Sequence, residues 1–221
     1  MTFTALTVIL IATVLVSLKA MNDPSMKEKW MYWPYQVKHS KESYRIISHI
    51  FIHADAAHLM FNMFTLYFLG SQALEPMLMN EYGALKGELH VVAIYFIGAL
   101  FATIIPFYRN QDNYEYRALG ASGAVSAIVF AMILWWPDME LYLMFMPIPI
   151  PAYWFGIFYL GYEIYMARRG NTGIAHDAHI GGAILGIIYI LVINPEKGSN
   201  FINVIISAIS DETSNLVFLR P

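Results

Sequence analysis

The stretch "RALGASGAVSAIVFAMILWW", residues 117–136, decides how this chain is interpreted. It places a serine, Ser122, among small residues and then continues as an apolar run suited to lipid. Hydrophobic residues make up 58% of the 221-residue chain, and charged residues make up only 13%. So few polar residues cannot cover a water-soluble surface, and the composition predicts an integral membrane protein.

Six apolar segments predict six transmembrane helices. A helix needs about 20 apolar residues to cross roughly 30 Å of hydrocarbon. The apolar character is nearly continuous within each segment, whereas strands of a membrane barrel alternate at every second residue. We therefore expect an all-α, polytopic bundle whose helices lie near residues 3–20, 56–74, 89–107, 121–136, 142–166 and 178–194.

The chain is expected to form one membrane domain, residues 1–198, followed by a C-terminal tail, residues 199–221. The apolar part of the tail is too short to span a bilayer, so we expect it at the surface or frayed. Residues from about 21 to 55 form a long connection, which we expect to be a folded interfacial loop. An ordinary aromatic belt would explain its headgroup-favouring side chains equally well: Trp30, Tyr32, Trp33 and Tyr35.

Polar side chains inside the apolar segments are candidates for function because each one is costly to place in lipid. His58 and Asn62 share a helix face in the second segment, Ser122 opens the fourth, and His179 opens the sixth. Consecutive spans alternate in direction, so these three segments begin on the same side of the membrane. A G-x-x-x-G spacing at 182–186 permits close helix packing, which would bring the serine and the histidine together.

A serine next to a histidine is suited to nucleophilic catalysis. A histidine can accept a proton from a serine hydroxyl near neutral pH, which makes Ser122 a candidate nucleophile and His179 its candidate base. His58 and Asn62, together with the Ser122 backbone N–H, are candidates for stabilising an oxyanion. Asp177 is two residues from His179 and faces another side of the helix. The sequence therefore favours a Ser–His dyad over a triad that includes Asp177.

Three motifs resemble the rhomboid family of intramembrane serine proteases. "HLMFN" (58–62), "GASG" (120–123) and "AHIGGAILG" (178–186) are similar to the family patterns H-x-x-x-N, G-x-S-G and A-H-x-x-G-x-x-x-G. They occur in the same order and in the second, fourth and sixth segments. The resemblance covers residues from about 40 to 194.

The resemblance implies a rhomboid-like bundle with Ser122 as nucleophile, His179 as general base, and His58 and Asn62 as oxyanion-stabilising residues. The implied activity is cleavage of transmembrane substrate proteins within a lipid membrane, near the ends of their helices, with no cofactor and no metal. Two positions depart from the family. Ser126 stands where several rhomboids have an aromatic that stacks on the catalytic histidine, and Tyr44 replaces the tryptophan of a Trp-Arg pair.

The resemblance also implies an orientation: a bacterial inner or plasma membrane protein with its active site facing the extracytoplasmic side. The positive-inside rule predicts the inverse. Three basic residues lie on the opposite face (Lys86, Lys197, Arg220), against ten on the active-site face (Lys19, Lys27, Lys29, Lys38, Lys41, Arg45, Arg109, Arg117, Arg168, Arg169). We adopt the family orientation, because folded loops can be translocated despite their charges.

Two other functions remain open. A metal-handling membrane protein would use histidines as zinc ligands, from among His49, His53, His58, His176 and His179. This metal hypothesis leaves the "GASG" motif at residues 120–123 without a role. A catalytically silent, rhomboid-like binder of membrane helices is the other; the intact Ser122 and His179 argue against it, and the departure at Ser126 keeps it open. The formal net charge of −3 gives no basic surface for nucleic acid, and the oligomeric state is not encoded in any recognisable pattern.

Overall fold

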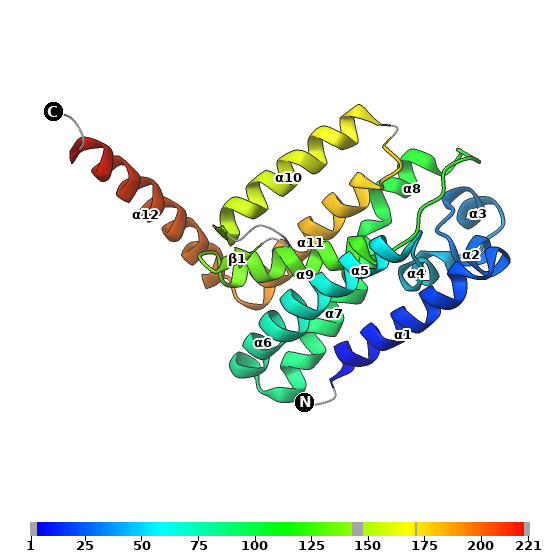
Figure 1. Ribbon diagram of the computed structural model, residues 1–221, viewed down its shortest axis with the longest axis horizontal. Coiled ribbons are helices and arrows are strands. Elements are labelled where there is room, and N and C mark those ends of the chain that lie inside the picture. The colour runs from blue at the N-terminus through cyan, green and yellow to red at the C-terminus, as the bar shows by residue number, and fades with distance from the viewer. Residues whose placement is uncertain (1–3, 143–147, 171, 219–221) are drawn as a thin grey trace.

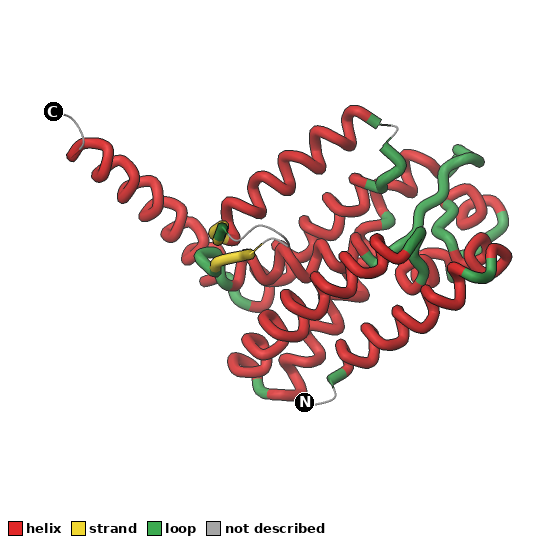
Figure 2. The backbone as a smooth tube through the Cα atoms, in the orientation of Figure 1, coloured by secondary structure: helices red, strands yellow, loops and turns green. Residues whose placement is uncertain are grey.

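The structure is a computed structural model that describes the backbone of residues 4–142, 148–170 and 172–218 and the side chains up to residue 210. Most of the described chain is helical (Figure 2). The helices are α1 (Ala5–Met21), α2 (Pro24–Trp30), α3 (Pro34–His39), α4 (Arg45–Ser48), a 3-10 helix (His49–Phe51), α5 (Ala56–Thr65), a π-helix (Leu66–Leu74), α6 (Glu75–Tyr82), α7 (Ala84–Ala102), α8 (Ile104–Asn110), α9 (Ser122–Trp135), α10 (Ala152–Arg169), α11 (His176–Ile193) and α12 (Glu196–Phe218). Two short strands, β1 (Glu140–Tyr142) and β2 (Pro149–Pro151), pair antiparallel with Leu141 opposite Ile150.

Helix α9 is the central element of the bundle. Every residue from Gly123 to Trp135 is buried, as required of a helix that is apolar on all sides. Helices α5, α7, α10 and α11 and the π-helix all contact it, and Figure 1 shows α9 running through the middle of the molecule. Ser122, the first residue of α9, is only partly buried, at the end of this enclosed helix.

Helices α9 and α11 touch through their backbones. A Cβ atom added to Gly182 would lie 1.9 Å from the carbonyl oxygen of Gly123, and one added to Gly186 would lie 2.2 Å from that of Ala127. Only glycine fits at such separations. The close approach expected from the G-x-x-x-G spacing is present, and it fixes the position of α11 along α9.

The outer surface of the bundle is apolar. Large apolar side chains are exposed on α1 and α10, with Leu15 63% and Phe158 67% exposed. Contiguous apolar surface of this kind is typical of contact with lipid. Two helical stretches, Ala84–Asn110 and His176–Ile193, are long and apolar enough to cross a membrane, and α1 and α9 are shorter apolar helices. Six spans therefore remain a prediction, whereas the helical bundle is observed.

Two boundaries differ from those expected. The predicted fifth segment began at residue 142, but α10 begins at Ala152, after β2, and residues 143–147 lie outside the described part of the chain. Pro149 and Pro151 lack the backbone N–H that a helix uses, and each also restricts the residue before it. The tail, expected at the surface or frayed, forms α12, which projects away from the bundle (Figure 1). Phe3, in the first predicted segment, and Arg220, in the count of basic residues, lie outside the described residues.

The interfacial loop is folded and packs on the connection between α8 and α9 rather than lying free. Tyr32 and Trp33 are almost fully buried. Tyr32 forms an antiparallel bridge with Ala118, and the Trp33 indole donates to the Tyr114 carbonyl at 3.0 Å. These two aromatics are thus part of the protein interior, which an aromatic belt in the headgroup layer does not explain. Longer loop segments gather at this end of the bundle, near α2, α3 and α8 (Figure 2).

The contact between α9 and α11 can be tested at Gly182. We expect Gly182→Ala to lower the free energy of unfolding by about 1–3 kcal/mol, because the new Cβ would force the helices apart. Unfolding midpoints in detergent micelles, titrated with a denaturing detergent, measure the effect. Gly161→Ala on α10 is the matched control, since its Cβ would meet no atom within 4 Å. Equal midpoints for the two variants would show that the backbones do not touch at Gly182.

Candidate functional site

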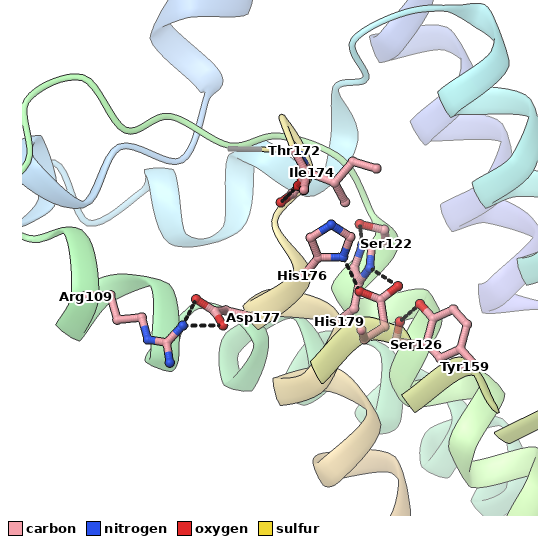
Figure 3. Close-up of polar contacts among 10 residues, drawn as sticks. Arg109, Ser122, Ser126, Tyr159, Thr172, Ile174, His176, Asp177 and His179 are labelled. Carbon is pink, nitrogen blue, oxygen red and sulfur yellow. Dashed lines mark hydrogen bonds and ion pairs between the residues drawn. The ribbon is translucent and has the colours of Figure 1, made fainter. Parts of the chain in front are cut away.

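The hydroxyl of Ser122 and the imidazole of His179 form a hydrogen bond. The Ser122 Oγ lies 2.7 Å from the His179 Nε2 (Figure 3). Ser122 is the first residue of α9, and His179 lies in the first turn of α11. The two side chains are partly buried, and they meet at the same end of the bundle, as the alternation of spans predicted.

The backbone turn before Ser122 requires glycine. Gly120 has a φ of +114°, in the region that side chains with a Cβ rarely adopt. A Cβ at this position would also lie 2.6 Å from the Cε1 of His58. The His58 ring therefore packs directly against the residue that turns the chain into α9, and this contact joins α5 to the start of the serine helix.

His53 holds the next residue of the same turn. Its ring is fully buried, and its Nε2 accepts the Ala121 backbone N–H at 3.2 Å. The other nitrogen, Nδ1, must then carry the proton, which it donates to the Ser17 Oγ at 2.8 Å; that hydroxyl donates to the Phe51 carbonyl at 2.9 Å. This pattern requires a neutral ring, and burial lowers the pKa of His53 to about 3. His53 thus has a structural role.

All four residues predicted for the site line one cavity of about 1140 Å³. Asp55 caps α5 by accepting the His58 N–H at 2.8 Å, which sets where the helix begins. Asn62 lies one turn later, is 6% exposed, and donates its side-chain amide to the His58 carbonyl at 2.9 Å. His58 and Asn62 therefore lie on the cavity wall with Ser122 and His179.

A carboxylate that the sequence analysis missed lies beside His179. Glu163 of α10 is 3% exposed, and its Oε1 lies 3.1 Å from the His179 Nδ1, at ion-pair distance. Its Oε2 lies 2.5 Å from the Nδ1 of His176. Asp177 points elsewhere and binds Arg109 at 2.8 Å, as Figure 3 shows. The available signal was an isolated carboxylate within the fifth apolar segment, which should have been weighed as a functional candidate.

An aromatic side chain also lies against His179. The Tyr159 ring of α10 is nearly parallel to the imidazole, with ring centroids 6.5 Å apart and planes inclined by 29°. Its hydroxyl lies 3.1 Å from the Ser126 Oγ. Ser126 stands where several rhomboids have an aromatic that stacks on the catalytic histidine. In this chain the ring beside His179 is Tyr159, from a neighbouring helix, and Ser126 is the hydrogen-bonding partner of its hydroxyl.

Among the described residues, Glu163, His176 and His179 could hold a metal ion. One nitrogen or oxygen from each lies within 4.8 Å of the others. Two imidazoles and a carboxylate are a ligand set suited to zinc. His49, His53 and His58, which the metal hypothesis also included, do not belong to this group.

Comparison with known proteins identifies the family of the chain. A family model for the Rhomboid domain matches residues 40–196. The chain belongs to the rhomboid family. The family resemblance stated from the three motifs is therefore confirmed, and membership implies an integral membrane protein.

Two curated rhomboid relatives illustrate the range of the match. The chain is 34% identical over 186 residues to "RHOMBOID-like protein 12, mitochondrial" of Arabidopsis thaliana, covering 80% of this chain and 54% of that protein. It is 24% identical over 170 residues to "Rhomboid protease GlpG" of Klebsiella pneumoniae, covering 72% of this chain and 51% of the relative. The chain thus spans about half the length of the curated relatives it matches.

Buried neutral histidines make the stability of this rhomboid pH-dependent. Between its ordinary pKa of 6.5 and about 3, His53 gains a proton in the unfolded chain but not in the folded one. The free energy of unfolding therefore falls as the pH decreases through that window. Above pH 6.5 the ring is neutral in both states, so His53 adds nothing to the pH dependence of stability there. We expect thermal midpoints in detergent to drop between pH 7.5 and pH 5, and to drop less in His53→Gln.

The matched control for this measurement is His39→Gln. His39 is exposed on α3 and contacts Asp112, outside the turn before Ser122. Its replacement should leave the pH dependence as in the wild type. If His53→Gln and the wild type lose stability equally on acidification, then His53 is not the neutral, buried group described above.

Proposed function

We propose that this rhomboid protein is an intramembrane serine endopeptidase that cleaves transmembrane substrate proteins. Ser122 is the nucleophile and His179 is the general base. The observation that carries the proposal is the 2.7 Å contact between the Ser122 Oγ and the His179 Nε2 at the wall of a large cavity. This contact supports a protease over the catalytically silent binder of membrane helices, because a binder has no need of an activated hydroxyl.

Acylation follows from the geometry of this contact. The Ser122 Oγ attacks the carbonyl carbon of the scissile peptide bond while its proton passes to the His179 Nε2. The tetrahedral intermediate collapses, the C–N bond breaks, and His179 gives the proton to the leaving amine. The acyl group is then held as an ester on Ser122.

Deacylation uses the same two side chains and needs no cofactor. A water molecule gives a proton to His179 as its oxygen attacks the ester carbon, and the returning Ser122 oxygen takes that proton back. Water must reach His179 for this step. The wide cavity lined by Ser122, His179 and polar loop residues such as Asn113 and Thr172 supports such access.

Three groups are suited to hold the oxyanion. The backbone N–H of Ser122 lies in the first turn of α9, where N–H groups have no intrahelical partner, and the positive end of the helix dipole adds to it. The side chains of His58 and Asn62 lie on the same cavity wall. The Asn62 amide is engaged with the His58 carbonyl in this structure, so it would need to turn toward the substrate oxygen.

The lining of the cavity supports an apolar helical substrate. Apolar side chains from three helices form one part of the wall: Phe61 from α5, Val125 and Val129 from α9, and Phe155 from α10. Polar loop residues form another part. A substrate that leaves lipid and is cut near the end of its helix meets both environments, which is the chemistry expected of a transmembrane protein substrate.

For location, we propose a bacterial inner or plasma membrane with the active site on the extracytoplasmic side, although one relative is named as mitochondrial. Several of the basic residues that oppose this orientation are paired. Lys38 lies 2.8 Å from Asp112, and Arg109 lies 2.8 Å from Asp177. Arg45, which is almost fully buried, pairs with Glu42 at 2.6 Å. These pairs are contacts of a folded loop, and it is as a folded unit that we propose this loop is translocated.

The nucleophile and base can be tested by replacement. We expect Ser122→Ala and His179→Ala each to reduce cleavage by at least about 10⁴-fold, with unfolding midpoints close to that of the wild type. The substrate is a synthetic single-span peptide with a fluorophore and a quencher at either side of one helix end. Ser40→Ala, on the exposed loop after α3, is the control and should cleave normally. Wild-type cleavage by Ser122→Ala would refute the mechanism.

Asn62→Ala tests the oxyanion assignment separately. Loss of one donor should reduce kcat by about 10²-fold, less than loss of the nucleophile, because the Ser122 N–H and His58 remain. The same peptide assay measures kcat and KM. Met60→Ala, an exposed position on the same helix, is the control and should not change kcat. If Asn62→Ala raises KM and leaves kcat unaltered, Asn62 binds substrate rather than the oxyanion.

A further inference from the structure

We infer that Glu163 is a positioning residue for the general base, so that the site operates as a Ser122–His179–Glu163 triad with His176 holding the carboxylate. The inference rests on the proposed protease function. It extends the expected Ser–His dyad by a carboxylate from α10, a helix that supplied none of the predicted site residues.

The geometry around His179 gives Glu163 a defined task. The Nε2 of His179 faces the Ser122 Oγ at 2.7 Å, and its Nδ1 lies 3.1 Å from the Glu163 Oε1. A carboxylate at that place favours the tautomer with the proton on Nδ1, which leaves the Nε2 lone pair free to accept the serine proton. After proton transfer, the same carboxylate stabilises the imidazolium. The approach is at ion-pair distance rather than a directed hydrogen bond, and such contacts tighten when substrate binds.

His176 fixes the carboxylate itself. Its Nδ1 lies 2.5 Å from the Glu163 Oε2, and its Nε2 is buried without a hydrogen-bond partner among the described residues. An unpaired N–H donor costs more than an unpaired lone pair in a buried site, so the ring is expected to carry its proton on Nδ1. His176 therefore donates to Glu163, and it leaves Oε1 of the carboxylate directed at His179.

The alternative occupant of this cluster is a zinc ion. Two ligands of one tetrahedral zinc stand about 3.3 Å apart, given metal–ligand distances near 2.0 Å. The 2.5 Å between the His176 Nδ1 and the Glu163 Oε2 is a hydrogen-bond separation instead. The Nε2 of His179 is also directed at Ser122. The cluster is thus arranged for holding and moving a proton.

Burial makes Glu163 distinctive on its helix. The buried residues of α10 are Ala152, Tyr153, Gly156 and Glu163, so the carboxylate is the one buried side chain in the second half of that helix. Removing its charge leaves an amide of the same shape when glutamine replaces it. Glu163→Gln therefore separates the electrostatic role of this side chain from a role in packing α10 against α11.

The test measures how fast Ser122 reacts with a fluorophosphonate carrying a fluorophore, using the full chain in detergent. For Glu163→Gln we expect kinact to fall by at least about 10²-fold with KI unchanged. The acidic limb of the pH–rate profile should also move to lower pH, because a negative charge beside the base has been removed. Tyr165→Phe, which alters an exposed side chain on the same helix, is the control and should react as the wild type does.

His176→Phe provides a second route to the same answer. It keeps the Glu163 charge and removes only the donor that holds it, so kinact should fall by less than in Glu163→Gln. The double variant should be no slower than Glu163→Gln alone, because the two side chains act through one contact. If Glu163→Gln does not fold, as judged by its unfolding midpoint, His176→Phe decides: wild-type kinact would overturn the inference.

The outcomes separate this inference from the proposed function. Labelling of the wild type that is lost in Ser122→Ala supports the protease, and unchanged kinact and pH profile in Glu163→Gln would then overturn only the triad. Absence of Ser122-dependent labelling in the wild type would overturn both. Retention of one equivalent of zinc by the purified wild type, with labelling abolished by a chelator, would show that a metal and not a proton network orders these three residues.

Discussion

The backbone contact between α9 and α11 is the constraint on which the rest of the site depends. Gly182 and Gly186 let the carbonyl groups of α9 lie where a side chain would otherwise stand. This contact sets both the distance between the two helices and their register along one another. Once that register is set, the first turn of α11 lies beside the first turn of α9, and His179 reaches Ser122. A polar pair inside an apolar bundle thus owes its position to residues that have no side chain.

The other parts of the site come from elements that surround this helix pair. The loop before α5 shapes the turn at Gly120 and Ala121, while α5 itself brings Asn62 and His58 to the cavity wall. Helix α10 covers the imidazole with Tyr159 and places Glu163 beside it. Each element contributes one or two polar groups to a molecule that is otherwise apolar. This economy fits a membrane setting, where every additional buried polar group must find a partner.

The sequence was sufficient for the helical bundle, for the depth shared by Ser122 and His179, and for the close packing at 182–186, because all three follow from hydrophobic length, chain direction and residue size. It was not sufficient for Glu163 or Tyr159. Their roles depend on the rotation of α10 about its own axis, and α10 has only a few buried positions from which that rotation could be inferred. The start of α10 was also misplaced, because the apolar run continues through Pro149 and Pro151, which lie in β2 before the helix begins at Ala152.

The chain of hydrogen bonds from Ser17 through His53 to Ala121 links the first helix to the residue immediately before Ser122. Its partners are separated by 36 and 68 positions in the sequence. Contacts between such distant positions form late, after the intervening segments have been brought together. The turn that presents Ser122 is therefore complete only when the first helix, the loop before α5 and the start of α9 have come together, so the Ser122–His179 geometry belongs to the assembled bundle and to no single part of it.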